Sequence, residues 1–298
     1  MCTAAAVLTA CPGGLVAAGE GEGEGESEAV DRGPTSIPLD GDPNGLTLRD
    51  DGTLLIADDN NNRVLAYVDG EGTSVFADLP TAAANGPGLG AVAVLDDGRL
   101  VLPRFGFGSA GDVVVVEPDG TSRVVPNLDA TRRRIGAVQG PDGTVYIAGF
   151  VVVGDGRKLG TVWRLDLDTG AEVSVLDGFA KPVGLLVVGD TLFISDQERR
   201  EIATARFPDL DDVSTFASGL PSADLLSAGP DGALFTGSKD GDVLRIDSAG
   251  AFTIVASDFQ EVRGTAYDAV NRRLFVADHD GDEGDGFTHA LKIVPVGE

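Results

Sequence analysis

Short runs of alternating apolar and polar residues recur along the chain from residue 35 onward. In the run GLTLRDDGTLLIADD (45–59), Leu54 and Ile56 alternate with Thr53 and Leu55, a period of two that predicts β-strands. An Asp-Gly pair between two such runs supplies the positive φ that tight hairpins need. No long stretch shows the 3.6-residue period of a helix. The pattern therefore predicts an all-β chain built from hairpins.

The unit of run, Asp-Gly turn and second run occurs six times. Its copies begin at Gly45, Ala91, Gly136, Gly184, Leu225 and Gly264. Successive copies start 46, 45, 48, 41 and 39 residues apart, which is the spacing of one four-stranded propeller blade per copy. Third runs follow at 63–70, 113–120, 162–170 and 243–250, and fourth runs at 74–78, 123–127, 172–177, 213–217 and 252–256. The sequence predicts a six-bladed β-propeller with four antiparallel strands per blade.

The last copy lacks a fourth run of its own, because the chain ends on a third run at 290–298. Residues 35–39, TSIPL, form one extra strand before the first copy. If this N-terminal strand joins the last blade, the ring closes and two exposed strand edges disappear. Five fourth runs and this strand make six, so the predicted propeller occupies residues 34–298.

The first repeat, DPNGLTLRDDGTLLIADDNNNRV, resembles NHL-repeat propellers and also the gluconolactonase and senescence-marker family of six-bladed propellers. The resemblance covers residues 35–298 as architecture. It implies a metal ion held by a Glu, Asn residues and an Asp at positions just before the first strands. Asn44 matches the Pro-Asn-Gly-Leu position of that set, and Asp224 matches it less closely. None of the six positions is Glu, and Arg263 stands where one would be sought.

The N-terminal segment differs from the repeats in composition. Within residues 1–11, Leu8-Thr9-Ala10-Cys11 resembles a bacterial lipobox, which implies cleavage before Cys11 and lipidation of that residue. Residues 12–33 contain the acidic low-complexity stretch GEGEGEGESE and are expected to form a disordered linker. We therefore expect an extracytoplasmic lipoprotein that meets the membrane only through a lipid anchor. An arbitrary Ala-rich tail is the alternative.

The net charge of −26 excludes nucleic acid as a partner, because phosphates and this surface repel each other. The acidic excess is explained by a solvated acidic surface, and a cation or a basic partner is the alternative. The repeats contain no cysteine, which excludes an internal disulfide, a thiol nucleophile and a cysteine metal cluster there. We expect a monomer.

Hairpin geometry places the start of each first strand and the end of each second strand on one face of a propeller. The residues before the first strands are Asn44, Gly90, Ile135, Val183, Asp224 and Arg263. The residues that end the second strands are Asp58, Arg104, Gly149, Asp196, Ser238 and Asp278. The longest loops on this face carry Phe105, Phe107, Phe150 and Phe287, which are candidates for the wall of a pocket.

The acids of this rim allow two interpretations. They could form an oxygen-rich site for Ca²⁺ or a polar ligand, with candidate ligands Asn44, Asp224, Asp278, Asp280 and Asp282. Alternatively, Asp58, Asp196 and Asp278 bond to backbone amides of their own loops and pair with Arg104 and Arg263. His279 and His289 lie in the last long loop, either as a hydrolytic base or as surface histidines.

Two functions follow from these residues. The first is a non-catalytic propeller that binds a small polar ligand or a protein through its loop-rich face. The second is a Ca²⁺-dependent hydrolase of lactones or related esters, as the resemblance to gluconolactonases implies. No cofactor is certain from the sequence, and Ca²⁺ is the candidate.

Overall fold

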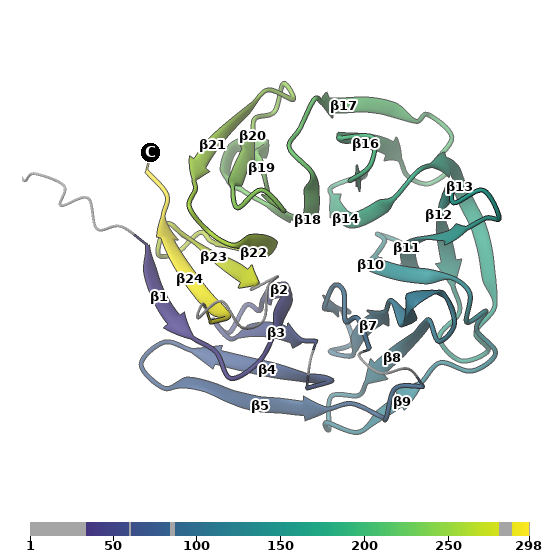
Figure 1. Ribbon diagram of the computed structural model, residues 1–298, viewed down its shortest axis with the longest axis horizontal. Helices are drawn as coiled ribbons and strands as arrows, with labels where there is room; N and C mark the ends of the chain where they lie inside the picture. Colours follow the sequence, from purple (N-terminus) through teal and green to yellow (C-terminus); the bar gives the residue numbers. More distant parts are fainter. Residues whose placement is uncertain (1–33, 60, 84–86, 280–287, 298) are drawn as a thin grey trace, which may run out of the picture. The chain divides into compact units, whose positions relative to one another are not determined.

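The computed structural model describes residues 34–59, 61–83, 87–279 and 288–297. These residues belong to one compact unit. Their strands form six separate four-stranded antiparallel sheets, which are arranged as blades around a central axis (Figure 1). The predicted six-bladed propeller is confirmed. The predicted lipobox and linker, including Cys11, lie outside the described residues.

The strands occupy four positions counted outward from the axis. The innermost strands are β2 (Pro43–Leu48), β6 (Ala93–Val94), β10 (Arg133–Gln139), β14 (Pro182–Val188), β18 (Ala223–Ala228) and β22 (Glu261–Asp268). The second strands are β3 (Leu54–Asp58), β7 (Leu100–Arg104), β11 (Val145–Val152), β15 (Thr191–Asp196), β19 (Leu234–Ser238) and β23 (Arg273–His279). The third strands are β4 (Arg63–Val68), β8 (Asp112–Val116), β12 (Lys158–Leu165), β16 (Glu201–Arg206), β20 (Val243–Ile246) and β24 (Ala290–Pro295).

The outermost strands show how the ring closes. They are β5 (Gly72–Asp78), β9 (Ser122–Val124), β13 (Glu172–Phe179), β17 (Ser214–Ser218), β21 (Phe252–Ala256) and β1 (Thr35–Pro38). The N-terminal strand β1 pairs with β24 from Thr35 opposite Ile293 to Pro38 opposite Ala290. The predicted closure of the last blade by the N-terminal strand is therefore confirmed.

The hydrophobic core lies between neighbouring blades, because each sheet is buried on both faces. In β3, Leu55 and Ala57 pack against the second blade, whereas Leu54 and Ile56 pack against the last blade. Six clusters of this kind follow one another around the ring, one at each blade boundary. Successive residues of one strand thus serve two different interfaces.

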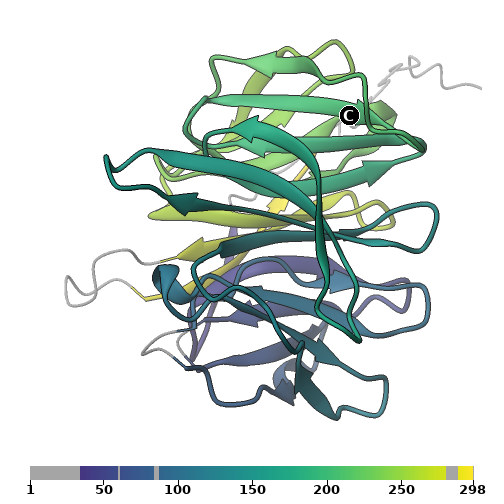
Figure 2. The ribbon, with the colours of Figure 1, turned by 90° about the vertical axis from the view of Figure 1, so that its right-hand side faces the viewer.

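Blade two departs from the predicted pattern. Its innermost strand β6 spans only Ala93–Val94, although the sequence predicts a strand from Ala91. The Ala91 N–H instead donates to the Ile135 carbonyl of the next blade, at 2.9 Å. A short 3₁₀ turn, η1 (Gly106–Gly108), follows β7 and stands out from one face of the ring (Figure 2). No helix among the described residues has the length and apolar character that crossing a membrane requires.

Candidate functional site

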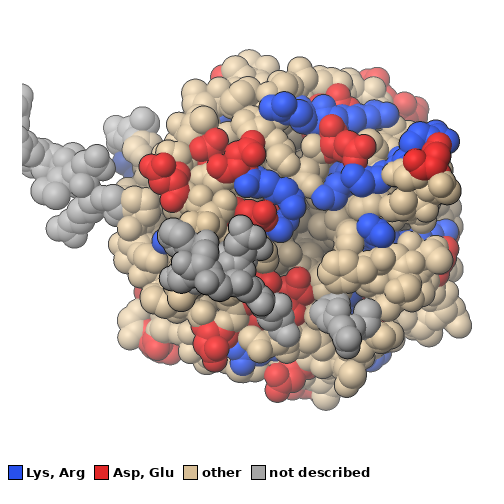
Figure 3. Space-filling view, viewed as in Figure 1, with Lys and Arg blue, Asp and Glu red and all other residues tan. Residues whose placement is uncertain are grey.

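A cavity of about 330 Å³ opens where the innermost strands begin, at one end of the propeller axis. All six residues predicted to precede the first strands line it: Asn44, Gly90, Ile135, Val183, Asp224 and Arg263. The sequence-based prediction that these positions converge on one axial mouth is confirmed. Figure 3 shows this face, with basic side chains gathered along one side of the central hollow.

Glycines next to these positions allow the innermost strands to approach one another closely. A Cβ atom on Gly45 would lie 2.5 Å from the Gly90 carbonyl oxygen, and one on Gly264 would lie 2.4 Å from the Asn44 carbonyl oxygen. Side chains at these points would therefore force neighbouring blades apart. Because glycine stands there, the residues just before it meet around one narrow mouth.

The residues that end the second strands do not line the cavity, contrary to the prediction. Asp58 is fully buried and accepts hydrogen bonds from the Asp42 N–H at 2.9 Å and from Arg63 Nε at 2.6 Å. Asp196 accepts the backbone N–H groups of Ala180, at 2.7 Å, and Lys181, at 3.0 Å. These carboxylates tie the loop that enters each blade to the blade itself.

Asp278 and Arg104 are likewise held by partners within their own blade or its entering loop and do not face the cavity. Asp278 accepts the Gln260 N–H at 2.8 Å and lies 3.4 Å from Lys292 Nζ. Arg104 is 1% exposed and forms two hydrogen bonds to Asp112, both of 2.6 Å. The interpretation that the three acids bond to backbone amides is therefore correct. Their predicted pairing with Arg104 and Arg263 is wrong, because Asp58 pairs with Arg63, Asp196 with Arg199 and Asp278 with Lys292.

The cavity is lined instead by the next residue along the chain in five of the six blades. These residues are Asp59, Phe105, Gln197, Lys239 and His279. Successive side chains of a strand point to opposite sides. The residues predicted to line the cavity therefore point away from it, and their next neighbours line it. Lys181, which stands two residues before Val183, also lines the cavity and was not predicted.

One wall of the cavity is aromatic. Phe105 and Phe107 line it, with ring centroids 5.2 Å apart in an edge-to-face arrangement. Phe150 lies behind Phe105, at 5.8 Å between centroids, and is only 1% exposed. Ile135 and Val183 extend this apolar wall, and Phe287 lies outside the described residues. The wall suits the apolar face of a small ligand.

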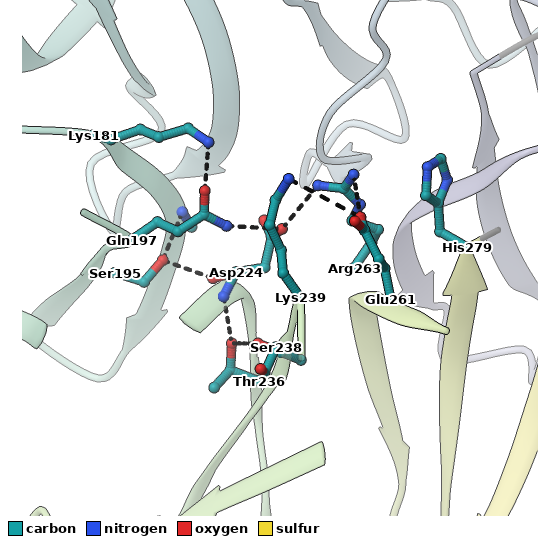
Figure 4. Close-up of polar contacts among 12 residues, drawn as sticks. Lys181, Ser195, Gln197, Asp224, Thr236, Ser238, Lys239, Glu261, Arg263 and His279 are labelled. Atoms are coloured by element: carbon teal, nitrogen blue, oxygen red, sulfur yellow. Dashed lines mark hydrogen bonds and ion pairs between the residues drawn. The ribbon is translucent and has the colours of Figure 1, made fainter. Parts of the chain in front are cut away.

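The opposite wall is charged and centred on Asp224, which is 4% exposed (Figure 4). Its carboxylate accepts Gln197 Nε2 at 3.3 Å and lies 3.5 Å from Arg263 Nη1. Burial raises the pKa of Asp224, while Arg263 and Lys181 act in the opposite direction. The Asp224 backbone is fixed by two hydroxyls, since Ser195 donates to its carbonyl and its N–H donates to Thr236.

Three cations surround this carboxylate. Arg263 Nη2 lies 2.6 Å from Glu261, and Lys239 Nζ lies 4.0 Å from the same glutamate. Lys181 donates to the amide oxygen of Gln197, a neutral partner. Burial lowers the pKa of Lys181 to about 8, which is close to neutral pH. Lys181 is thus a titratable cation at the edge of the cavity whose hydrogen-bond partner carries no charge.

Two aspartates and two histidines gather at the wall formed by the first and last blades. The imidazole of His279 lines the cavity, and its Nδ1 contacts a carboxylate oxygen of Asp42. Asp59 accepts the Leu89 N–H at 2.8 Å, and burial raises the pKa of Asp59. His289 Nδ1 lies 3.6 Å from the same Asp42 oxygen. The two histidines, far from being exposed, converge on one buried aspartate.

Of the predicted calcium ligands that the structure describes, Asn44 and Asp224 line the cavity and Asp278 does not. Ca²⁺ takes six to eight oxygen ligands, but among the six axial positions only Asn44 and Asp224 carry a side-chain oxygen. Arg263 and Lys181 already neutralise Asp224, and Asp278 is turned into its own loop. Asp280 and Asp282 lie outside the described residues. The donor set at the axial positions does not fit calcium.

The sequence matches no protein-family model, and it matches no curated protein sequence. Several solved structures are similar. A gluconolactonase from Xanthomonas campestris is 19% identical, with a TM-score of 0.65 over 90% of this chain and 99% of that one. The calcium-binding protein regucalcin from Agrobacterium tumefaciens is 13% identical, with a TM-score of 0.67 over 87% of this chain and 94% of that one. Virginiamycin B lyase from Staphylococcus aureus is 14% identical, with a TM-score of 0.60 over 88% and 99%.

The chain has the six-bladed propeller fold of these proteins. At 13–19% sequence identity, the similarity to these structures shows the fold alone. The chemistry of the cavity is therefore inferred from the residues that line it.

Proposed function

We propose that this propeller is an enzyme that hydrolyses a small ester or lactone in the axial cavity. One observation carries the proposal. The cavity is lined by two cations, Lys181 and Arg263, and by a histidine, His279, whose Nδ1 contacts a buried carboxylate. Arg263 lies on the strand next to that of His279 in the last blade, and Lys181 stands in blade four. Acyl hydrolysis needs these two parts, a positive group where the oxyanion develops and a group that activates water.

The charged wall suits the carbonyl end of a substrate. Arg263 Nε is buried without a hydrogen-bond partner among the described residues, and Lys181 has only a neutral acceptor in Gln197. Both can donate to an oxygen that gains negative charge in the transition state. Such donors stabilise an oxyanion strongly because the protein has already oriented them.

The remaining lining suits the body of a small substrate. Phe105, Ile135 and Val183 offer an apolar surface beside the charged wall. The volume of about 330 Å³ is at the small end of the range for ligand sites. A compact molecule with one apolar face and one carbonyl group therefore fits better than a polymer or a peptide.

Water activation would come from the wall that holds His279. A histidine held by a carboxylate can activate water as a base, or it can do so as the ligand of a metal ion. Either route generates the nucleophile beside His279, in the last blade, which also carries Arg263. The charged wall would then receive the oxyanion.

The similar proteins support an enzyme over a passive binding module. Gluconolactonase, luciferin-regenerating enzyme and virginiamycin B lyase are all enzymes by name. A non-catalytic ligand-binding propeller is the second candidate, and the same cavity would serve it. The two candidates differ in turnover alone.

The test measures hydrolysis of a panel of small lactones and esters. The rate is obtained from the acid released while the pH is held constant. The full chain should turn over at least one substrate, and Lys181→Met should lower kcat/KM by about 10²-fold or more, the usual cost of losing one oxyanion donor. Arg206→Met is the matched control, because Arg206 forms an exposed ion pair with Asp190 outside the cavity. Binding without turnover would favour the second candidate, and equal rates for both variants would contradict the role of Lys181.

A further inference from the structure

Three side chains from distant parts of the chain converge beside the cavity. Asp42 precedes β2, His279 ends β23 and His289 precedes β24. One nitrogen of each histidine and one oxygen of Asp42 lie within 4.8 Å of one another. The two imidazole rings stand 5.4 Å apart between centroids and are tilted by 47°. Two imidazoles therefore point at a single carboxylate oxygen.

The backbone holds each of these residues in place. The Asp42 N–H donates to Asp58 at 2.9 Å, and the Asp42 carbonyl accepts the Asp59 N–H at 2.8 Å. The His289 carbonyl accepts the Leu39 N–H at 3.0 Å. His279 lies in the ladder between β22 and β23, opposite Glu261. The cluster is therefore preorganised by the same hydrogen bonds that close the first and last blades.

Burial separates this cluster from ordinary surface acids. The side chain of Asp42 is 7% exposed, and those of His279 and His289 are 16% and 17% exposed. A hydrogen-bonded His–Asp pair requires only one imidazole. The second imidazole, directed at the same oxygen, makes the cluster a three-ligand set of two nitrogens and one oxygen.

We propose that Asp42, His279 and His289 bind a divalent transition-metal ion of the zinc type. Imidazole nitrogen favours Zn²⁺ and its neighbours over Ca²⁺ and Mg²⁺, which prefer oxygen. Three protein ligands leave a fourth position for water, as catalytic zinc sites do. Because His279 also lines the cavity, the metal ion would lie in the cavity wall. The inference rests on the proposed function for its catalytic role but not for metal binding.

A metal ion at this site would supply the hydroxide that hydrolyses the ester. A bound water releases one proton to solvent, since zinc lowers the pKa of such a water to about 7. The resulting hydroxide forms a bond to the carbonyl carbon, and the oxyanion faces Lys181 and Arg263. The bond from carbon to the alkoxy oxygen then breaks, and the alkoxide takes up one proton. An ester gives one carboxylic acid and one alcohol, a lactone gives one hydroxycarboxylic acid, and neither reaction needs an oxidant or reductant.

The experiment measures metal binding directly, independently of hydrolysis. The full chain carrying Cys2→Ser and Cys11→Ser, which removes both thiols, is stripped of metal and titrated with Zn²⁺ and with Co²⁺. We expect one ion per chain and a visible Co²⁺ absorption band of a four- or five-coordinate site. His289→Gln should weaken binding by about 100-fold or more, since even outer-shell changes cost 10- to 100-fold.

Matched controls keep the result interpretable. His289→Gln is the main variant because His289 is not among the residues that line the cavity. Asp190→Asn is the control, because Asp190 is an exposed acid of the ion pair with Arg206. Thermal melts of the metal-free proteins establish that each variant is folded, and Asp42→Asn provides a second ligand variant if His289→Gln is not.

The outcomes separate the two proposals. Absence of stoichiometric binding, or binding that persists in both His289→Gln and Asp42→Asn, overturns the metal site. Hydrolysis that survives removal of metal by a chelator also overturns its catalytic role, while leaving the proposed function intact and His279 as a base. Stoichiometric, ligand-dependent binding with no hydrolysis of any substrate supports the metal site and contradicts the proposed function.

Discussion

Asp224 shows how a buried carboxylate is retained in a small cavity. Its burial disfavours the charged form and raises its pKa, and the cations Arg263 and Lys181 partly offset this effect. Burial also disfavours the charged form of Lys181 and lowers the pKa of that lysine. The two groups therefore support each other, and a ligand that enters between them exchanges one set of charge contacts for another.

The depressed pKa of Lys181 predicts a pH-dependent affinity for the carboxylate product. Asp224 attracts the ammonium, while Lys239, Lys158 and Arg263 oppose it together with burial, so the pKa falls to about 8. Below that pH the ammonium is charged and attracts the carboxylate, and above it the attraction is lost. Calorimetry with small hydroxycarboxylates should therefore show affinity falling about tenfold between one pH unit below and one unit above the pKa.

Lys181→Met supplies the control for this prediction. The variant should bind weakly at all these pH values and show no fall through pH 8. A fall of the same size in the variant would assign the titration to another group.

Sequence reasoning located half of the cavity at residue level. A Gly follows this position in four of the six repeats and the repeat spacing marks it in the other two, so Asn44, Asp224 and Arg263 were correctly placed at the axis. The ends of the second strands were misplaced by one residue, because Asp58 and Asp196 are conspicuous acids whose carboxylates bond to backbone amides. Because every residue of β3 is buried, the period of two does not distinguish Asp58 from Asp59. Contacts such as His279 with Asp42 join residues 237 apart and have no local signal.

At the scale of elements, the hairpin is the unit that the sequence predicts best. Asp-Gly turns mark the first hairpin of several blades, and Gly52, Gly98 and Gly143 all have the positive φ that such turns require. The strand β6 is the exception, since it pairs with β7 over only two residues while the preceding Ala91 bonds to blade three. Local pattern cannot report such contacts between blades.

The closing strand is the element whose loss should matter most. Deleting residues 35–39 removes β1 from the edge of β24 and takes Leu39 and Ile37 out of the core between the first and last blades. The third strand of the last blade would then present an open edge to other molecules. We expect a lower melting temperature and aggregation, measured by thermal unfolding and light scattering.

Deletion of residues 19–28 serves as the control for length at the N-terminus. That stretch contains only Gly, Glu and Ser, so its removal should leave the melting temperature unchanged. If both deletions were tolerated equally, the paired strand β1 would contribute nothing to the closure of the ring.

At the scale of the whole molecule, charge is distributed unevenly. The chain carries a net charge of −26, yet three cations line the axial cavity. Figure 3 shows basic side chains along one side of the hollow on a face that elsewhere bears scattered acids. An acidic exterior keeps proteins soluble and repels anionic membranes and nucleic acids, while the local cations suit one small oxygen-rich ligand.

The N-terminal residues predict that the protein is anchored to a membrane through a lipid on Cys11. If Cys11 is lipidated, the protein made in a bacterium that processes lipoproteins should partition into detergent, and Cys11→Ser should move it to the aqueous phase or leave it unprocessed. Two or more acyl chains give stable anchoring, whereas one gives only marginal binding. The acidic stretch at 19–28 would be repelled by anionic headgroups and would hold the propeller away from the surface. Cys2→Ser is the matched control, because Cys2 does not follow the Leu-Thr-Ala sequence. Recovery of the unaltered chain and Cys11→Ser in the same phase would rule out the anchor without affecting the cavity or its chemistry.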